Sequence, residues 1–97
     1  MPDLLISSLA REDLKTIGRY TQQNWGVRQR NIYFRAFATM FDDIRDRAMV
    51  GEQRPEIRPG ILSCRCNRHV IFFRRDASGT VEILRILHQR MDFPRHL

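Results

Sequence analysis

The chain of 97 residues has one lysine, two cysteines and no long hydrophobic run. Its longest apolar run beyond the N-terminal segment, Val70 to Phe73, is far too short to cross a bilayer. The short apolar stretch at the N-terminus contains Asp3, which argues against a secretory signal. We therefore expect a cytoplasmic protein without direct membrane contact. The length suits one domain over residues 1–97, and a domain this small would gain stability from a partner.

The spacing of the two cysteines indicates a packing role rather than a redox or metal-binding role. Cys64 and Cys66 stand one residue apart in a stretch that is typical of a strand, so their side chains share a face at a spacing of about 6.6 Å. That distance is near the upper limit for a disulfide, which favours reduced thiols. The three histidines, His69, His88 and His96, have no metal-ligand spacing with the thiols. We expect no metal site and no cofactor.

Acidic residues are in the minority, and the basic excess is almost entirely arginine. Seventeen basic residues against eleven acidic residues give a net charge of +6, and all the basic residues except Lys15 are arginines. Arginine presents a planar fork of donors that fits carboxylates and phosphates in two-point contacts. The composition predicts an anionic partner, and both nucleic acid and an acidic protein segment satisfy it.

The first half of the chain predicts a strand followed by a helical hairpin. A short apolar strand over Asp3 to Ile6 precedes Ser7 and Ser8, which are favourable helix N-cap residues. The helix that follows should end near Asn24 to Gly26, because glycine permits the left-handed closing conformation. A second helix is predicted from Val27 to about Met49. Its aromatic residues recur at helical spacing and are predicted to be core rather than base-stacking residues: Phe34, Phe37 and Phe41.

The second half predicts a loop and three strands. Gly51 to Gly60 contains two glycines and two prolines, so we expect a loop with a few extended residues around Ile57. Strands are then predicted over Leu62 to Asn67, His69 to Arg75 and Val81 to His88, with the one containing Val70 to Phe73 in the centre. Residues 76–80 have the composition of a hairpin loop, and Pro94 limits any helix in the tail to one turn.

The predicted fold class is α+β, in the order β-α-α-β-β-β. A helical hairpin would pack on one face of a small, curved, mainly antiparallel sheet. The opposite face of the sheet would then be available for function.

Several segments in this order resemble the ParE toxins of the RelE/ParE superfamily, from bacterial type II toxin-antitoxin systems. Three positions depart from the usual family pattern: Ser8 stands in place of proline, and Asn67 and Gln89 stand in place of glycine. The segments that carry the resemblance are Ser7, Ala10, Asp13, Leu14, Ile17, Tyr20, Thr21, Trp25 and Gly26, then RPG at 58–60, RHVIFFR at 68–74, VEILRILHQRMD at 81–92, and the terminal Arg95, His96 and Leu97.

The resemblance implies a RelE/ParE-like fold and a toxin encoded on a plasmid or a chromosome. Such a toxin forms a hetero-oligomer with a ParD-like antitoxin and, when free, inhibits DNA gyrase and arrests growth. This action is by binding, so the resemblance implies a protein that is not an enzyme. The alternative is a ribosome-dependent endoribonuclease of the RelE type. A DNA-binding accessory is less favoured because no recognition helix with base-reading side chains is present.

The endoribonuclease alternative depends on Glu56, Arg68 and His88. A carboxylate or imidazole would deprotonate a 2'-hydroxyl, a second group would protonate the leaving oxygen, and arginine would stabilise the phosphorane. The C-terminal tyrosine that is common in the RNA-cleaving members is missing here. The plain interpretation is a loop carboxylate at Glu56 and a histidine that ends a strand at His88.

Two sets of basic residues are predicted to bind the antitoxin. Arg11, Lys15 and Arg19 repeat at i,i+4 on the first helix, where like charges destabilise an isolated helix and favour an acidic partner. A merely solvated helix face is the alternative for this set. On the strands, three arginines are predicted to point away from the open face of the sheet toward solvent, because an arginine in the core would be costly: Arg65, Arg68 and Arg85. Ordinary cross-strand pairing with Glu82 or Asp76 is the alternative for this set.

A third set is predicted to contact the target of the toxin. It combines the RPG motif of the loop with the tail, whose role is otherwise the least explained by the sequence. The residues are Arg58, Arg90, Met91 and Asp92.

Overall fold

A computed structural model describes residues 3–97, and their elements follow the predicted order. The first strand and the helical hairpin are β1 (Leu4–Ile6), α1 (Ser8–Trp25) and α2 (Val27–Arg45). A short strand, β2 (Glu52–Gln53), lies in the predicted loop, so the extended residues of that loop are not around Ile57 as expected. The remaining elements are β3 (Leu62–Cys66), β4 (His69–Arg75), β5 (Val81–His88) and the single-turn α3 (Phe93–His96).

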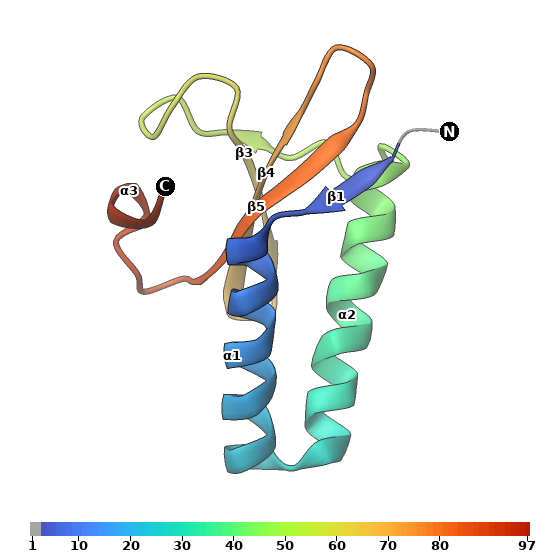
Figure 1. The fold of residues 1–97 in the computed structure, drawn as a ribbon, viewed down its shortest axis with the longest axis vertical. Coiled ribbons are helices and arrows are strands. Elements are labelled where there is room, and N and C mark those ends of the chain that lie inside the picture. Colours follow the sequence, from blue (N-terminus) through green and yellow to red (C-terminus); the bar gives the residue numbers. More distant parts are fainter. Residues whose placement is uncertain (1–2) are drawn as a thin grey trace.

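The five strands form one sheet in the order β1-β5-β4-β3-β2, with β4 at its centre as predicted. The short β1 runs parallel to β5, and the other three pairs are antiparallel. The hairpin of α1 and α2 covers one face of the sheet and extends well past its end (Figure 1). The predicted fold class, a helical hairpin on a small, mainly antiparallel sheet, is confirmed.

Local capping explains the bounds of α1. The hydroxyl of Ser7 accepts a hydrogen bond from the amide of Ala10 at 3.0 Å and itself donates to the main-chain oxygen of Leu84 at 2.7 Å. The helix thus starts at a fixed point on β5. It ends at Gly26, which has a φ of 93° and whose amide bonds to the oxygen of Gln22. Both ends agree with the sequence prediction.

The second helix ends earlier than predicted, at Arg45 rather than near Met49. Arg47 adopts a left-handed φ of 62°, and the amide of Met49 reaches back to the oxygen of Asp43 at 3.0 Å. The guanidinium of Arg75, on β4, binds the last turn of α2 and the segment that follows it. It donates to the main-chain oxygens of Ile44, Met49 and Val50 at 2.8 to 3.0 Å.

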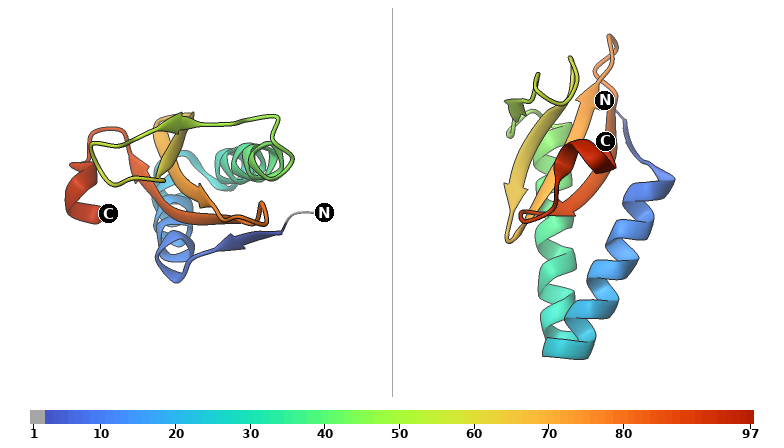
Figure 2. Two further views of the ribbon diagram at one scale, coloured as in Figure 1. Left: turned by 90° about the horizontal axis from the view of Figure 1, so that it is seen from above. Right: turned by 90° about the vertical axis from the view of Figure 1, so that its left-hand side faces the viewer.

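Two apolar clusters hold the sheet, one on each face. The larger lies under the helices and includes Phe37, Ile44 and Phe73, each at most 1% exposed. The smaller, on the opposite face, centres on Phe72 and Leu87. There the ring of Phe93 packs edge-on against Phe72, with 4.9 Å between centroids. Because β4 is apolar on both faces, the tail and the β2–β3 loop cover much of the face that we expected to be available (Figure 2).

Candidate functional site

Arg85 does not lie on an open face, so that prediction is wrong. Its guanidinium forms a two-point ion pair with Asp13 of α1, with N–O distances of 2.8 and 2.9 Å. The same carboxylate accepts a hydrogen bond from the amide of Ile86, and Arg85 also donates a hydrogen bond to the main-chain oxygen of His96. The hydrogen bonds that Arg85 donates to Asp13 raise the pKa of the Arg85 guanidinium. The pair therefore joins α1, β5 and the tail inside the fold.

A pocket of about 420 Å³ opens beside this ion pair, and we call it the histidine pocket. It lies between α1, the start of α2, the turn of the β3–β4 hairpin and the end of β5. Two of its aromatic side chains are largely exposed: Trp25 at 69% and Tyr20 at 63%. Exposed aromatic and arginine side chains are typical of binding surfaces. The pocket is also lined by Tyr33, Arg68, His69, His88 and Met91.

The two histidines of the pocket lie against each other and against the core. The rings of His69 and His88 meet edge-on with 5.3 Å between centroids, and His69 also packs edge-on against Phe37. Burial lowers the pKa of His69 to about 4, and the nearby His88 acts in the same direction. His69 is therefore neutral near pH 7. The Nδ1 atom of His88 accepts a hydrogen bond from the amide of Arg90 at 3.2 Å, which places the start of the tail beside the pocket.

The low pKa of His69 predicts that the fold loses stability in mild acid. The unfolded chain takes up a proton on this residue near pH 6.5, whereas the folded chain resists it down to about pH 4, so stability falls between these values. Urea midpoints at pH 7.0, 6.0 and 5.0 measure the loss. The His69→Gln variant should show a flatter dependence over this range. An unchanged slope in the variant would contradict the assignment.

The three residues of the endoribonuclease alternative are not brought together. Arg68 and His88 line the histidine pocket on the helix side of the sheet. Glu56 lies in the β2–β3 loop and accepts a hydrogen bond from Arg54 at 2.7 Å, which lowers the pKa of Glu56. The guanidinium of Arg54 in turn lies over the rings of Phe72 and Phe93, on the other face. A shared acid-base site is therefore not formed.

The predicted antitoxin-binding residues of α1 share an exposed face. Arg11, Lys15 and Arg19 are all exposed, and their i,i+4 spacing places them on one side of the helix. The amine of Lys15 lies 3.4 Å from the carboxylate of Glu12, which is a pair between two well-exposed side chains and contributes little stability. From residue 14 to residue 41, the hairpin has five basic residues and no acidic one. This stretch of one charge sign is a signal that the sequence predictions did not use.

The tail and the loop that carry the predicted target contacts lie next to each other. Ile57 of the β2–β3 loop packs in the same apolar cluster as Phe93 and Leu97 of the tail. Arg58, one residue after Ile57, is exposed, as are the three tail residues of the prediction. Met91, 46% exposed, also lines the histidine pocket. The tail thus connects the two faces of the sheet. Its residues that were predicted to contact the target are Arg90, Met91 and Asp92.

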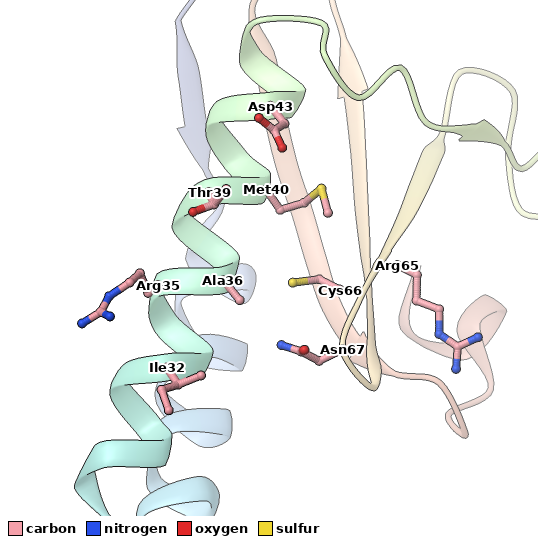
Figure 3. A pocket seen from close by; sticks show the side chains of 9 residues that line it. All are labelled: Ile32, Arg35, Ala36, Thr39, Met40, Asp43, Arg65, Cys66 and Asn67. Atoms are coloured by element: carbon pink, nitrogen blue, oxygen red, sulfur yellow. The ribbon is translucent and has the colours of Figure 1, made fainter.

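A second hollow, which the sequence predictions missed, lies between α2 and the outer edge of β3. This groove of about 500 Å³ is lined by Ile32, Ala36 and Met40 of α2 and by Cys66 of β3 (Figure 3). Arg65, beside it, points away from α2, and its guanidinium donates a hydrogen bond to Gln89. The i,i+4 spacing of the three helix residues was the only sequence signal for the groove.

The thiols behave as predicted and lie in the core. Cys64 and Cys66 are buried and not bonded to each other, and burial raises the pKa of Cys64 to about 12, which makes it a poor nucleophile. Within residues 3–97, no three side chains of metal-binding type come together. In the same range, every helix is too short or too polar to cross a membrane.

Comparison with known proteins shows similarity over nearly the whole chain. The family described as "ParE toxin of type II toxin-antitoxin system, parDE" matches residues 4–93. The toxin ParE1 of Mycobacterium tuberculosis is 36% identical over 93 residues, which cover 96% of this chain and 95% of that protein. The toxin ParE1 of Caulobacter vibrioides is 35% identical over 92 residues, 95% of this chain and 94% of that one.

The fold has a counterpart among solved structures. A chain of the chromosomal ParDE toxin-antitoxin system from P. aeruginosa superposes with a TM-score of 0.76 at 21% sequence identity. The superposition covers 91% of this chain and 96% of the other. At this identity the likeness concerns the fold.

Proposed function

Since the chain belongs to the ParE toxin family of type II toxin-antitoxin systems, we propose that it inhibits DNA gyrase when free and that a ParD-like antitoxin neutralises it. The observation that carries the proposal is the extent of the family match, which runs from β1 to the first residue of α3. It therefore includes the ion pair of Asp13 with Arg85 and the histidine pocket. An arginine-rich surface with a net charge of +6 suits an acidic antitoxin segment.

We further propose that the toxin acts by binding and not by catalysis. The separation of Glu56 from Arg68 and His88 supports this, because general acid-base catalysis needs its groups within hydrogen-bond reach of one substrate. Exposed Trp25, Tyr20 and Arg68 around the histidine pocket are instead typical of a protein interface.

Controlled expression of the free toxin in bacteria tests both parts of the proposal. DNA-damage induction, cell filamentation and the positions of messenger RNA ends are scored in the same cultures. Gyrase inhibition predicts damage and filaments with intact messages, and co-expression of the cognate antitoxin should suppress them. Cleaved messages without DNA damage would contradict the proposal and favour the endoribonuclease alternative.

Loss of one exposed arginine should weaken antitoxin binding without unfolding the toxin. We expect Arg68→Ala to raise the dissociation constant about tenfold, which is about 1.4 kcal/mol, because it removes a charge at the rim of the histidine pocket. Arg28→Ala, on the exposed distal end of the hairpin, removes the same charge and serves as the matched control. Isothermal titration measures the affinity, and thermal melting of each variant measures the fold. Equal losses from both variants would indicate a non-specific charge effect.

A further inference from the structure

The positive charge of the chain is concentrated in the distal part of the helical hairpin. Residues 14–41 contain five basic residues and no acidic one. In the rest of the chain, twelve basic residues stand against eleven acidic residues, so this stretch carries five of the six net charges. The stretch forms most of α1 and α2, whose turn at Gly26 projects beyond the end of the sheet (Figure 1, Figure 2). The molecule thus has one strongly positive end and a nearly neutral body.

Four of the five basic side chains are exposed, on the sides of the helices that face away from the core. Arg28 and Arg35 stand about two turns apart on α2, so they share one side, opposite the buried Phe37. Arg35 points away from the sheet in Figure 3. On α1, Arg19 lies opposite the buried Thr21. We call the four exposed residues the hairpin basic surface: Lys15, Arg19, Arg28 and Arg35.

The fifth basic residue, Arg30, holds the two helices together beside the turn. Its guanidinium donates to the side-chain oxygen of Gln22, on α1, at 2.5 Å and to that of Asn31 at 3.2 Å. The two helices are therefore positioned before any partner binds. A surface that is already ordered loses less conformational entropy on binding.

The chemistry of this end of the hairpin fits a nucleic acid better than an acidic protein. The centres of protein-protein interfaces are depleted of charged residues, whereas protein-DNA interfaces are polar and strongly positive. Phosphate oxygens accept hydrogen bonds from arginine, lysine and amide side chains. Exposed amides surround the turn together with the basic residues: Gln22, Gln23, Asn24 and Asn31. A row of phosphates therefore meets donors along the whole surface and no opposing carboxylate.

We propose that the hairpin basic surface binds the phosphate backbone of duplex DNA without reading its sequence. This contact requires no recognition helix, because phosphates carry no sequence information. The inference goes beyond the proposed function, since it assigns a DNA contact to the toxin itself. Lys15 and Arg19 also belong to the predicted antitoxin-binding set. The experiment therefore uses the free toxin and substitutes Arg28 and Arg35.

Titration of the free toxin with a short labelled duplex of mixed sequence tests the proposal. Trp25 is the only tryptophan of the chain and lies beside the turn, so its fluorescence reports contact at this end of the molecule. Fluorescence anisotropy of the labelled duplex gives the dissociation constant. With four phosphate contacts, the affinity should fall roughly a hundredfold between about 50 and about 200 mM salt, a log-log slope of about −3.6.

Two substitutions locate the contact on the hairpin. Arg28→Ala and Arg35→Ala should each reduce the salt slope by about one, and the double variant should bind DNA at least tenfold more weakly. Arg95→Ala is the matched control, because it removes the same charge from the exposed α3, far from the turn (Figure 1). Its salt slope should equal that of the wild type. Thermal melting of each variant measures the fold, and Arg28→Ala should keep the affinity for antitoxin.

Three results would overturn the inference. One is the absence of saturable binding to the duplex at the lowest salt concentration. Another is an equal change of slope in Arg95→Ala and Arg28→Ala, both folded, which would show attraction by net charge alone. The third is tighter binding of a polyglutamate peptide than of a duplex of equal charge, which would assign the surface to an acidic protein. The proposed function is tested separately, because none of these DNA titrations contains gyrase.

Discussion

Replacing Asp13 by alanine should lower the free energy of unfolding by about 3 kcal/mol. The substitution leaves the guanidinium of Arg85 without its counter-charge at a position where only 17% of the side chain is exposed. It also removes the acceptor of the Ile86 amide, which lies 2.9 Å from the carboxylate. A buried donor left without a partner adds its own desolvation cost. The loss should affect α1, β5 and the tail together.

Urea denaturation of three variants measures this effect and isolates the pair. Glu12→Ala is the matched control, because this neighbouring carboxylate is well exposed and its pair with Lys15 contributes at most about 0.5 kcal/mol. The double variant Asp13→Ala with Arg85→Met should be more stable than Asp13→Ala alone, since it buries no unpaired charge. A double variant that is the less stable of the two would contradict the explanation.

The second large effect is expected at Gly51. Replacing this glycine by alanine should destabilise the fold by about 3 kcal/mol, through two separate costs. Its φ of 91° is a conformation that residues with a Cβ rarely adopt. A Cβ built there would also lie 2.5 Å from Cζ of Phe73, whose side chain is fully buried and has no room to move.

Gly60 provides the control that separates the two costs. It has a similar φ of 85°, but a Cβ added there would meet no atom within 4 Å. Gly60→Ala should therefore cost only about 1 kcal/mol, which is the conformational part. Chemical denaturation of both variants gives the difference, which measures the collision with Phe73. Equal losses at the two glycines would show that Phe73 adjusts freely.

The bulge in β5 explains why the candidate site was harder to predict than the fold. Phe72 pairs with Arg85, whereas the next residue of β4, Phe73, pairs with Ile83, so one residue of β5 is extra. Ile83 and Ile86 are therefore both buried under the helices although they stand three apart. A bulge breaks the period-two rule on which the strand predictions rest. Arg85 is next to this irregularity, and its direction is decided by Asp13, which is 72 residues away in the sequence.

Apart from the two-residue β2, the sequence by itself determined the elements and their order, because these depend on short-range interactions. The cap at Ser7, the break at Gly26, the hairpin loop at 76–80 and the apolar strands were all readable from neighbouring residues. The shared face of Cys64 and Cys66 followed from the alternation of one strand.

The tertiary structure decided where the side chains act, because those outcomes depend on contacts between segments that are distant in the sequence. Arg75 of β4 binds the segment around the end of α2, because its guanidinium donates to the main-chain oxygens of Ile44 in the last turn and of Met49 just after the helix. The tail covers the second face of the sheet, where Phe93 and Leu97 pack in the cluster of Phe72. The groove beside β3 lies between α2 and the part of β3 that β2 leaves without a neighbouring strand.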